Sequence, residues 1–370
     1  MRLVMSIGSL RAGGAEHIIS MLASEFANRG HDVSVLTLSP RSEDFYKVSA
    51  PVRRVSVRRE SESSTFVGGA FANIGRVVAI RRALNQLRPH VVVSFITEMN
   101  VLVAAACIGR KNGLILSERI SPTHHRIGYL WRLLRSIFYR RAGVVVLQTK
   151  ETAHWFRSLF SEVINIAVIP NPVERYACRP LPGRSHAPKY ILSAGRLDHQ
   201  KGFDVLLKGF ASEVAPYSSI ELWIAGDGLL RESLRLQTES LGLVNRVRFL
   251  GQTECLPALM AGATAFVLAS RYEGFPNVLL EALSCGAPVV ATDCASGPRE
   301  ILVDGEFGLL VPPEDPVALG AAIQRLISDT SLAEKFACKA PQATIRYALP
   351  AIADSWEVLL SQEARTCKHR

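Results

Sequence analysis

Short runs of β-branched residues alternate with amphipathic segments along the first half of the chain. The first run leads into a glycine-containing loop and then into an apolar periodicity that predicts a helix from about Ala15 to Asn28. Gly30 follows at the position of a helix C-cap. This order predicts a parallel sheet with helices on both faces. The expected strands are Leu3–Ile7, Val33–Leu38, Val91–Phe95, Leu114–Leu116 and Val144–Leu147.

The same alternation restarts after residue 180. Between the halves, Ile169–Val173 and Pro180–Gly183 are rich in proline and glycine and predict an extended connector, with a domain boundary near Pro170. A final helical pattern spans about Pro350–Gln362. The strands expected in the second half are Tyr190–Ser193, Glu221–Ala225, Arg246–Leu250, Ala265–Ala269, Pro288–Ala291 and Gly308–Val311.

The length of 370 residues is typical of two domains, which we place at 1–169 and 170–349. The seven cysteines are scattered without a Cys-x-x-Cys pair, which favours free thiols in a reducing cytoplasm. The apolar run Met1–Ile7 is too short for a secretory signal, and no apolar stretch reaches the ~20 residues that span a bilayer.

The charge is uneven between the two halves. Up to Pro170 there are 23 Lys and Arg against 11 Asp and Glu, whereas the remainder has 20 against 22. A basic first half indicates an anionic partner, either nucleic acid or a membrane surface. No nucleic-acid-binding motif is recognisable, so we expect no nucleic-acid partner.

The richest motif is the segment Arg271–Leu283, which follows the expected strand Ala265–Ala269 and leads through a loop into a helix near Pro276. The unpaired N–H groups of a helix start form an anion site. Glu273 lies in the loop and Glu281 inside the helix, and carboxylates accept bidentate hydrogen bonds from paired sugar hydroxyls. Ordinary acid enrichment at a helix start is the alternative, but it leaves the accompanying set Gly274–Asn277 unexplained.

Arg196 and Lys201 lie between an expected strand and an expected helix, at the carboxyl end of the strand where open sheets bind ligands. Two fixed cations there can neutralise a diphosphate leaving group. The chain has no Asp-x-Asp pair for a metal, and we expect no metal requirement. The alternative is a solvated charge pair, although a cation at a helix start opposes the helix dipole.

These segments resemble the family 4 glycosyltransferases. The similarity lies in the Glu-x7-Glu motif from Glu273 to Glu281, in Gly195-Arg196-Leu197 with Lys201-Gly202, and in Gly226-Asp227-Gly228. The resemblance covers nearly the whole chain. It implies an α/β fold of the GT-B type, with two Rossmann-like domains whose parallel sheets face a cleft and a tail helix, about 350–370, that returns to the first domain.

The resemblance also implies roles for individual residues. Glu281 would bind the ribose of the donor nucleotide and Glu273 would contact the transferred sugar, with Arg196 and Lys201 as the other catalytic groups. The loop from Gly274 through Pro276 would line the donor site. Backbone N–H groups would bind donor oxygens at Phe275, Asn277 and Val278, whereas Pro276 has none to give.

Two loops of the first half are candidates for the rest of the site. Gly13 and Gly14, in the first strand-to-helix loop, permit close approach of a ligand and by resemblance would face the donor phosphate and sugar. Ser117-Glu118-Arg119, in a Ser-Glu-Arg-x-x-Pro segment, stands where many relatives carry a histidine. It is similar to a subset that acts on lipid-linked glycans. Glu118 either orients the acceptor hydroxyl or only holds Arg119.

The segment Arg126–Arg141 combines an apolar helical face with arginines, Trp131 and Tyr139. This pattern is typical of a helix resting on anionic lipid. It also fits a helix whose apolar stripe packs on the sheet. The positive charge of the whole first half favours association with the inner face of the cytoplasmic membrane.

We therefore expect a cytoplasmic, peripheral, retaining hexosyl- or N-acetylhexosaminyltransferase that moves sugar from a UDP-sugar to a lipid-linked or envelope glycan. The expected alternatives are a UDP-sugar 2-epimerase of the same fold and a catalytically silent glycan-binding subunit. No prosthetic group is expected.

Overall fold

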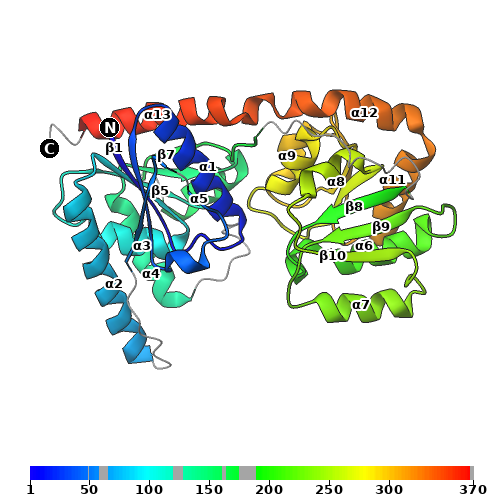
Figure 1. The fold of residues 1–370 in the computed structure, drawn as a ribbon, viewed down its shortest axis with the longest axis horizontal. Coiled ribbons are helices and arrows are strands. Elements are labelled where there is room, and N and C mark those ends of the chain that lie inside the picture. The colour runs from blue at the N-terminus through cyan, green and yellow to red at the C-terminus, as the bar shows by residue number, and fades with distance from the viewer. Residues whose placement is uncertain (49, 58–65, 120–127, 161–163, 175–188, 367–370) are drawn as a thin grey trace. The chain divides into compact units, whose positions relative to one another are not determined.

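The computed structural model describes residues 1–48, 50–57, 66–119, 128–160, 164–174 and 189–366. These residues divide into two compact units, one comprising Met1–Pro172 with Leu349–Arg370 and the other Val173–Ala348. Each unit is a parallel sheet between two layers of helices (Figure 1). The connector 180–183 expected from the sequence lies outside the described residues.

The first unit has a seven-stranded sheet in the order β3-β2-β1-β4-β5-β6-β7. Every expected strand of this half is confirmed, and two short edge strands, β3 and β7, were not predicted. The strands are β1 (Arg2–Ile7), β2 (Asp32–Thr37), β3 (Arg53–Ser56), β4 (Val91–Phe95), β5 (Gly113–Ser117), β6 (Val144–Leu147) and β7 (Ile166–Val168).

One face of this sheet packs against α1 (Gly14–Asn28) and α13 (Leu349–Thr366) in a continuous apolar core. The other face packs against α2 (Phe66–Leu87), α3 (Thr97–Ala106), α4 (Tyr129–Phe138) and α5 (Lys150–Phe160). The expected tail helix is thus α13, and Arg29 at the end of α1 anchors it through Glu357 at 2.9 Å. Trp356 on α13 is fully buried.

The second unit has a six-stranded sheet in the order β10-β9-β8-β11-β12-β13, and all six strands were expected. They are β8 (Tyr190–Ala194), β9 (Glu221–Ala225), β10 (Val247–Gly251), β11 (Ala265–Leu268), β12 (Val289–Thr292) and β13 (Leu309–Val311). One layer contains α8 (Leu256–Gly262), α9 (Asn277–Ser284), α10 (Pro298–Leu302) and the end of α12 (Thr330–Ala343); the other contains α6 (Phe203–Gly209), α7 (Arg231–Ser240) and α11 (Pro316–Ser328).

In both sheets the strand order reverses beside the first strand, at β1/β4 and at β8/β11. Open parallel sheets bind ligands at such a switch point, outside the carboxyl ends of the strands. Because neighbouring loops diverge there, a space opens that side chains of both loops can reach. Ligand-binding residues are therefore expected in the loops that follow β1, β4, β8 and β11.

Candidate active site

Lys201 and Glu273 meet at the switch point of the second unit. Lys201 ends a short 3-10 helix, His199–Lys201, after β8, and Glu273 lies in the loop after the neighbouring strand β11. The Lys201 ammonium donates to Glu273 Oε1 at 2.6 Å. Two residues that are 72 positions apart in the sequence thus form one charged pair at the carboxyl edge of the sheet.

The backbone around this pair is constrained by close contacts. Gly202 has a φ of +62°, and a β-carbon there would overlap the carbonyl oxygen of Ala269. Glycine alone adopts this conformation without strain and leaves room for that oxygen. The Arg271 guanidinium bonds Asp204 at 2.7 and 2.8 Å and so ties the loop after β11 to α6. The Lys201–Glu273 pair is therefore held by rigid loops on both sides.

Glu273 is only 3% exposed. Besides Lys201, its Oε1 accepts a hydrogen bond from the Ser270 hydroxyl at 2.6 Å, and its Oε2 accepts one from Gln200 Nε2 at 3.4 Å. A buried carboxylate requires such donors, because an unpaired buried charge is strongly unfavourable. In this arrangement Glu273 fixes the position of the Lys201 ammonium. Lys201 has three N–H groups, and its one bond within the described residues leaves two to donate.

Arg196 follows β8 in the same loop as Lys201, but its side chain lies in solvent. Its side chain is 70% exposed, and its nearest charged partner is Asp198 at 3.9 Å. The guanidinium is thus accessible to a ligand at the carboxyl edge of the sheet. The structure does not place it in the Lys201–Glu273 pair.

The expected helix start is confirmed, with α9 beginning at Asn277 and Pro276 as its N-cap. The members of the motif differ in environment. Phe275 is buried and packs edge-on against Tyr347 at 5.8 Å, so its ring is part of the core. The Asn277 N–H donates to the Phe275 carbonyl at 3.0 Å. The N–H groups of Phe275 and Val278 have no acceptor among the described residues, which leaves them as the donors of this helix start.

Glu281, half-buried on α9, is held in an unfavourable environment for a charge. Burial, and then the carboxylate of Glu174, raise the pKa of Glu281 to about 7. Near neutral pH, α9 therefore carries a carboxylate whose ionised form is destabilised by the fold. Such perturbed groups are concentrated at functional sites.

We expect Glu281→Gln to stabilise the second unit above pH 7 by on the order of 2 kcal/mol. The pKa of Glu281 is raised in the folded chain, so its contribution to stability is complete below pH ~4.5 and is lost as the pH rises through about 7. The gain should vanish near pH 4.5. Urea denaturation at the two pH values measures the difference, with exposed Glu254→Gln as control; equal stabilities of Glu281→Gln and wild type at pH 8 would contradict the assignment.

Several site residues carried no recognisable sequence signal. Ser270 and Gln200 bind Glu273, and the Ser296 hydroxyl donates to the Gly274 carbonyl at 3.1 Å. Cys294 is buried beside the pair: burial, and then the Glu273 carboxylate, raise the pKa of its thiol to about 12. It is therefore a neutral thiol. A lone polar residue in a loop has no periodicity or spacing, and only its contacts identify it.

The switch point of the first unit contains a cavity of about 250 Å³. Gly8 and Ser9 line it after β1, and Ile96 and Glu98 line it after β4. Ile96 has a φ of +74°, a strained conformation for a β-branched residue. Gly13 and Gly14 lie just beyond, at the start of α1, where the Glu16 carboxylate covers the Gly13 α-carbon. Their contact with a donor stays a prediction.

Glu118 and Arg119 directly follow β5 and are both buried, yet the structure does not pair them. Glu118 accepts hydrogen bonds from Thr97 Oγ1 at 2.8 Å and from the Tyr139 hydroxyl. Burial raises the pKa of its carboxyl group. Of the two alternatives for Glu118, the one in which it holds Arg119 does not fit this structure, because Glu118 bonds Thr97 and Tyr139 whereas Arg119 donates to Asn171. A role toward the acceptor stays a prediction.

Arg119 instead lies over aromatic rings. Its guanidinium is 4.7 Å from the centre of the Phe95 ring and 5.7 Å from that of Trp356, and it donates to Asn171 Oδ1. Nε and Nη2 have no partner within the described residues, and burial lowers the pKa of Arg119 to about 9. A buried cation with two unused donors is suited to an anionic group. Residues 120–127, which complete the Ser-Glu-Arg-x-x-Pro segment, lie outside the described residues.

The sequence matches two family models that together cover most of the chain. Residues 13–172 match the glycosyl transferase 4-like domain, and residues 179–343 match the glycosyl transferases group 1. The chain belongs to the glycosyltransferase family that these two models describe. It is 28% identical over 364 residues to the GalNAc-alpha-(1->4)-GalNAc-alpha-(1->3)-diNAcBac-PP-undecaprenol alpha-1,4-N-acetyl-D-galactosaminyltransferase of Campylobacter jejuni, covering 98% of this chain and 99% of the relative.

Solved structures establish the fold of this glycosyltransferase as GT-B. Sucrose-phosphate synthase from Thermosynechococcus elongatus matches with a TM-score of 0.84 at 20% identity, over 98% of this chain and 99% of that one. The Anabaena protein HepE, solved in complex with UDP, matches with a TM-score of 0.82 at 22% identity, over 98% and 100%. The expected fold class is thus confirmed.

The apolar residues of helix α4 do not form the single exposed or single buried face that the sequence predicts. Leu134, Phe138 and Trp131 pack on the core, whereas Leu130, Leu133 and Ile137 are 43%, 46% and 52% exposed. Arg132 and Arg140 are exposed. Arg135 is buried and lies over the rings of Phe156 and Phe160, so it is not among the arginines of this segment that could reach lipid. Arg126 lies outside the described residues.

Proposed function

We propose that the protein moves a sugar, with retention of anomeric configuration, from a UDP-sugar to a lipid-linked or envelope glycan. The observation that carries this proposal is the Lys201–Glu273 pair at the β8/β11 switch point, with Arg196 exposed in the same loop. Transfer breaks the bond between the sugar anomeric carbon and the diphosphate oxygen and forms a bond to the oxygen of an acceptor hydroxyl, whose proton passes to the leaving diphosphate. The diphosphate leaves with added negative charge, which Lys201 and Arg196 neutralise.

The second unit is proposed to bind the donor. Glu273 fixes the Lys201 ammonium, whose two remaining N–H groups are available to the diphosphate. The N–H groups of Phe275 and Val278 supply further donors to phosphate or sugar oxygens. Glu281 accepts hydrogen bonds from the ribose hydroxyls, as the family resemblance implies. Its pKa of about 7 means that UDP affinity should fall as the pH drops below neutrality and the carboxylate is protonated.

The first unit, Met1–Pro172 with Leu349–Arg370, is proposed to bind the acceptor. Arg119, with two unpartnered donors, is suited to an acceptor phosphate. The Campylobacter jejuni relative is named as an N-acetylgalactosaminyltransferase for a PP-undecaprenol substrate, which supports a lipid-linked acceptor and an N-acetylhexosaminyl donor. The alternative is a hexosyl donor, which a comparison of UDP-hexoses with UDP-N-acetylhexosamines distinguishes.

The apolar side chains exposed on α4 support attachment to an anionic membrane. No helix among the described residues has both the length and the apolar character to cross a bilayer. Leu130, Leu133 and Ile137 lie on one side of the helix with Arg132 and Arg140 exposed along it, an arrangement that combines apolar insertion with attraction to anionic headgroups. The protein would thus act at the inner face of the cytoplasmic membrane.

Donor and acceptor are tested together by measuring UDP release from a panel of UDP-hexoses and UDP-N-acetylhexosamines, with and without polyprenyl-diphosphate-linked glycans. We expect release from one donor class that increases strongly with a lipid-linked acceptor. The anomeric configuration of the product, determined by NMR, tests retention. If the protein releases UDP from none of the UDP-sugars in the panel, with or without acceptor, the proposed function is contradicted.

A further inference from the structure

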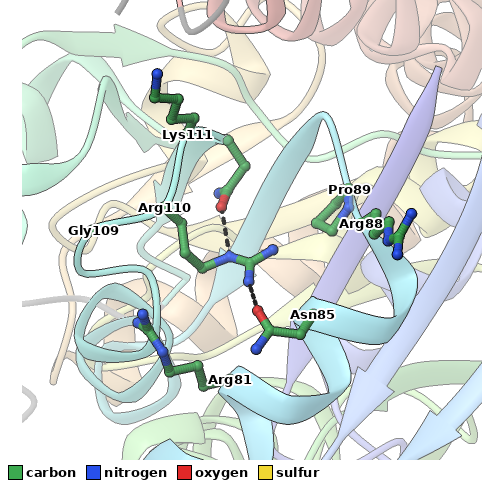
Figure 2. A pocket seen from close by; sticks show the side chains of 8 residues that line it. Arg81, Asn85, Arg88, Pro89, Gly109, Arg110 and Lys111 are labelled. Carbon is green, nitrogen blue, oxygen red and sulfur yellow. Dashed lines mark hydrogen bonds between the residues drawn. The ribbon is translucent and has the colours of Figure 1, made fainter.

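The first unit has a second, larger cavity, of about 460 Å³, that the glycosyl-transfer site does not explain. A volume of this size is typical of small-molecule sites. Two chain turns form it: the end of α2 with the turn into β4, and the turn between α3 and β5 (Figure 2). The lining residues are Arg81, Asn85, Arg88, Pro89, Gly109, Arg110, Lys111 and Asn112.

This cavity lies at the opposite edge of the sheet from the candidate acceptor residues. Pro89 and Asn112 precede the amino ends of β4 and β5, whereas Glu118 and Arg119 follow the carboxyl end of β5. A five-residue strand separates the two edges by roughly 16 Å at ~3.3 Å per residue. A ligand in the cavity therefore occupies a site of its own.

The lining contains four cationic side chains and no carboxylate. Two of the four have structural roles. Arg81 donates to the carbonyls of Ala106 and Ile108 at 2.9 and 2.6 Å, and Arg110 donates to the Leu84 carbonyl at 3.0 Å. A cation at a helix C-terminus stabilises the last carbonyls, so these contacts explain Arg81 and Arg110 without a ligand.

The positions of Arg88 and Lys111 are not explained by bonds to backbone carbonyls. Both are exposed, and neither side chain has a polar partner within the described part of the chain. They add positive charge to a lining that Arg81 and Arg110 already make basic. Burial, and in smaller part the neighbouring Arg81, already lower the pKa of Arg110. An anion bound in the cavity would be attracted by the positive charge of its lining.

A neutral donor completes the cavity. Asn85 Oδ1 accepts a hydrogen bond from the Arg110 guanidinium (Figure 2). Arg110 Nε also donates to Asn112 Oδ1 at 3.0 Å. Because the Asn85 oxygen is occupied, the amide is oriented and its Nδ2 is left to donate. The cavity thus presents several donors and a net positive charge.

We propose that this cavity is a binding site for phosphate oxygens, taking a diphosphate or a phosphate monoester through Arg88, Lys111 and Asn85 Nδ2. Arg81 and Arg110 supply the charge behind these contacts. The phosphate belongs either to a soluble molecule or to the headgroup of an anionic lipid, since both offer the same oxygens.

Calorimetric titration of inorganic pyrophosphate tests the site. All proteins carry Lys201→Ala, so that the candidate donor site contributes less to the signal. We expect Arg88→Gln with Lys111→Gln to weaken pyrophosphate binding at least tenfold, because two charge-assisted hydrogen bonds are lost. The matched control, Arg53→Gln with Lys150→Gln, removes the same charge from exposed positions outside the cavity and should bind as the parent does.

Co-sedimentation with vesicles of phosphatidylglycerol or phosphatidylcholine identifies the source of the phosphate. A loss of phosphatidylglycerol binding in the cavity variant, but not in the control, assigns the site to a lipid headgroup. A loss of pyrophosphate binding alone assigns it to a soluble phosphate. If the cavity variant and the control bind both probes equally, with unchanged melting temperatures, the proposal is overturned.

Discussion

Replacing Lys201 by Ala is expected to lower the rate of sugar transfer by about 10²-fold while the fold survives. The Lys201 ammonium is the cation that Glu273 holds at the carboxyl edge of the second sheet, at 2.6 Å. Loss of one preorganised charge contact to a leaving group costs on the order of 3 kcal/mol in the transition state. UDP release under saturating donor and acceptor measures the effect. Lys208→Ala, an exposed lysine on α6, is the matched control and should retain full turnover.

Glu273→Gln should lower the rate through the same ammonium. If Glu273 acts by positioning Lys201, the effects of Lys201→Ala and Glu273→Gln will not add in the double variant, because the two residues work as one unit. Arg196→Ala should cost less than Lys201→Ala, since solvent screens a side chain that is 70% exposed. Turnover of Lys201→Ala within a few-fold of wild type would contradict this assignment, as would complete loss of wild-type activity in EDTA.

The sheets were predictable because their strands are buried on both faces. A strand such as Val91–Phe95 is a continuous apolar run bounded by turn residues, and it occupies the expected positions. The strand β3 escaped prediction because its buried residue is Arg54, whose side chain pairs with Asp44 at 2.8 Å. Hydrophobic periodicity cannot identify a strand whose inward residue is charged, or one of three residues such as β7.

The candidate site was only partly predictable for a different reason. Motif spacing placed Arg196, Lys201 and Glu273 in loops that follow strands. It could not show that these two strands are neighbours or that only Lys201 contacts Glu273. That contact depends on how two loops fold, which Gly202 and the Arg271–Asp204 pair determine. The buried partners of Glu118 come from α3 and the turn after α4, and no local pattern links them.

The helix α4 shows how a correct pattern leads to a wrong orientation. Leu130, Leu133, Leu134, Ile137 and Phe138 fit a single apolar face, and the sequence assigns all of them together. In the structure the face is divided: Leu134 and Phe138 pack on the core and the other three are exposed. Arg135 takes a buried place over Phe156 and Phe160 that a periodic pattern would give to an apolar residue. Replacing Arg135 would therefore report on folding and not on lipid binding.

Replacing Leu130, Leu133 and Ile137 by Ser is expected to weaken binding to anionic vesicles by about 10²-fold. Each side chain is about half-exposed, so insertion into lipid removes further apolar area worth roughly 1 kcal/mol, or ~3 kcal/mol for the three. Arg132→Gln with Arg140→Gln should weaken binding by up to ~2 kcal/mol at low salt, at about 1 kcal/mol per basic residue, and by less as salt screens the charges. Co-sedimentation with phosphatidylglycerol vesicles at two salt concentrations measures both variants.

A matched variant separates insertion from a general loss of apolar surface. Leu229, Leu236 and Val244 are exposed in the second unit, and their replacement by Ser should leave vesicle binding unchanged. UDP affinity should be unchanged in the α4 variants, because the proposed donor residues of the second unit lie in the other unit from α4. Since apolar insertion does not depend on ionic strength, the arginine variants should lose the salt dependence while the leucine and isoleucine variant keeps it. If the triple variant at α4 pellets with vesicles as wild type does, the exposed face of α4 does not enter lipid, and its apolar side chains must contact a protein surface.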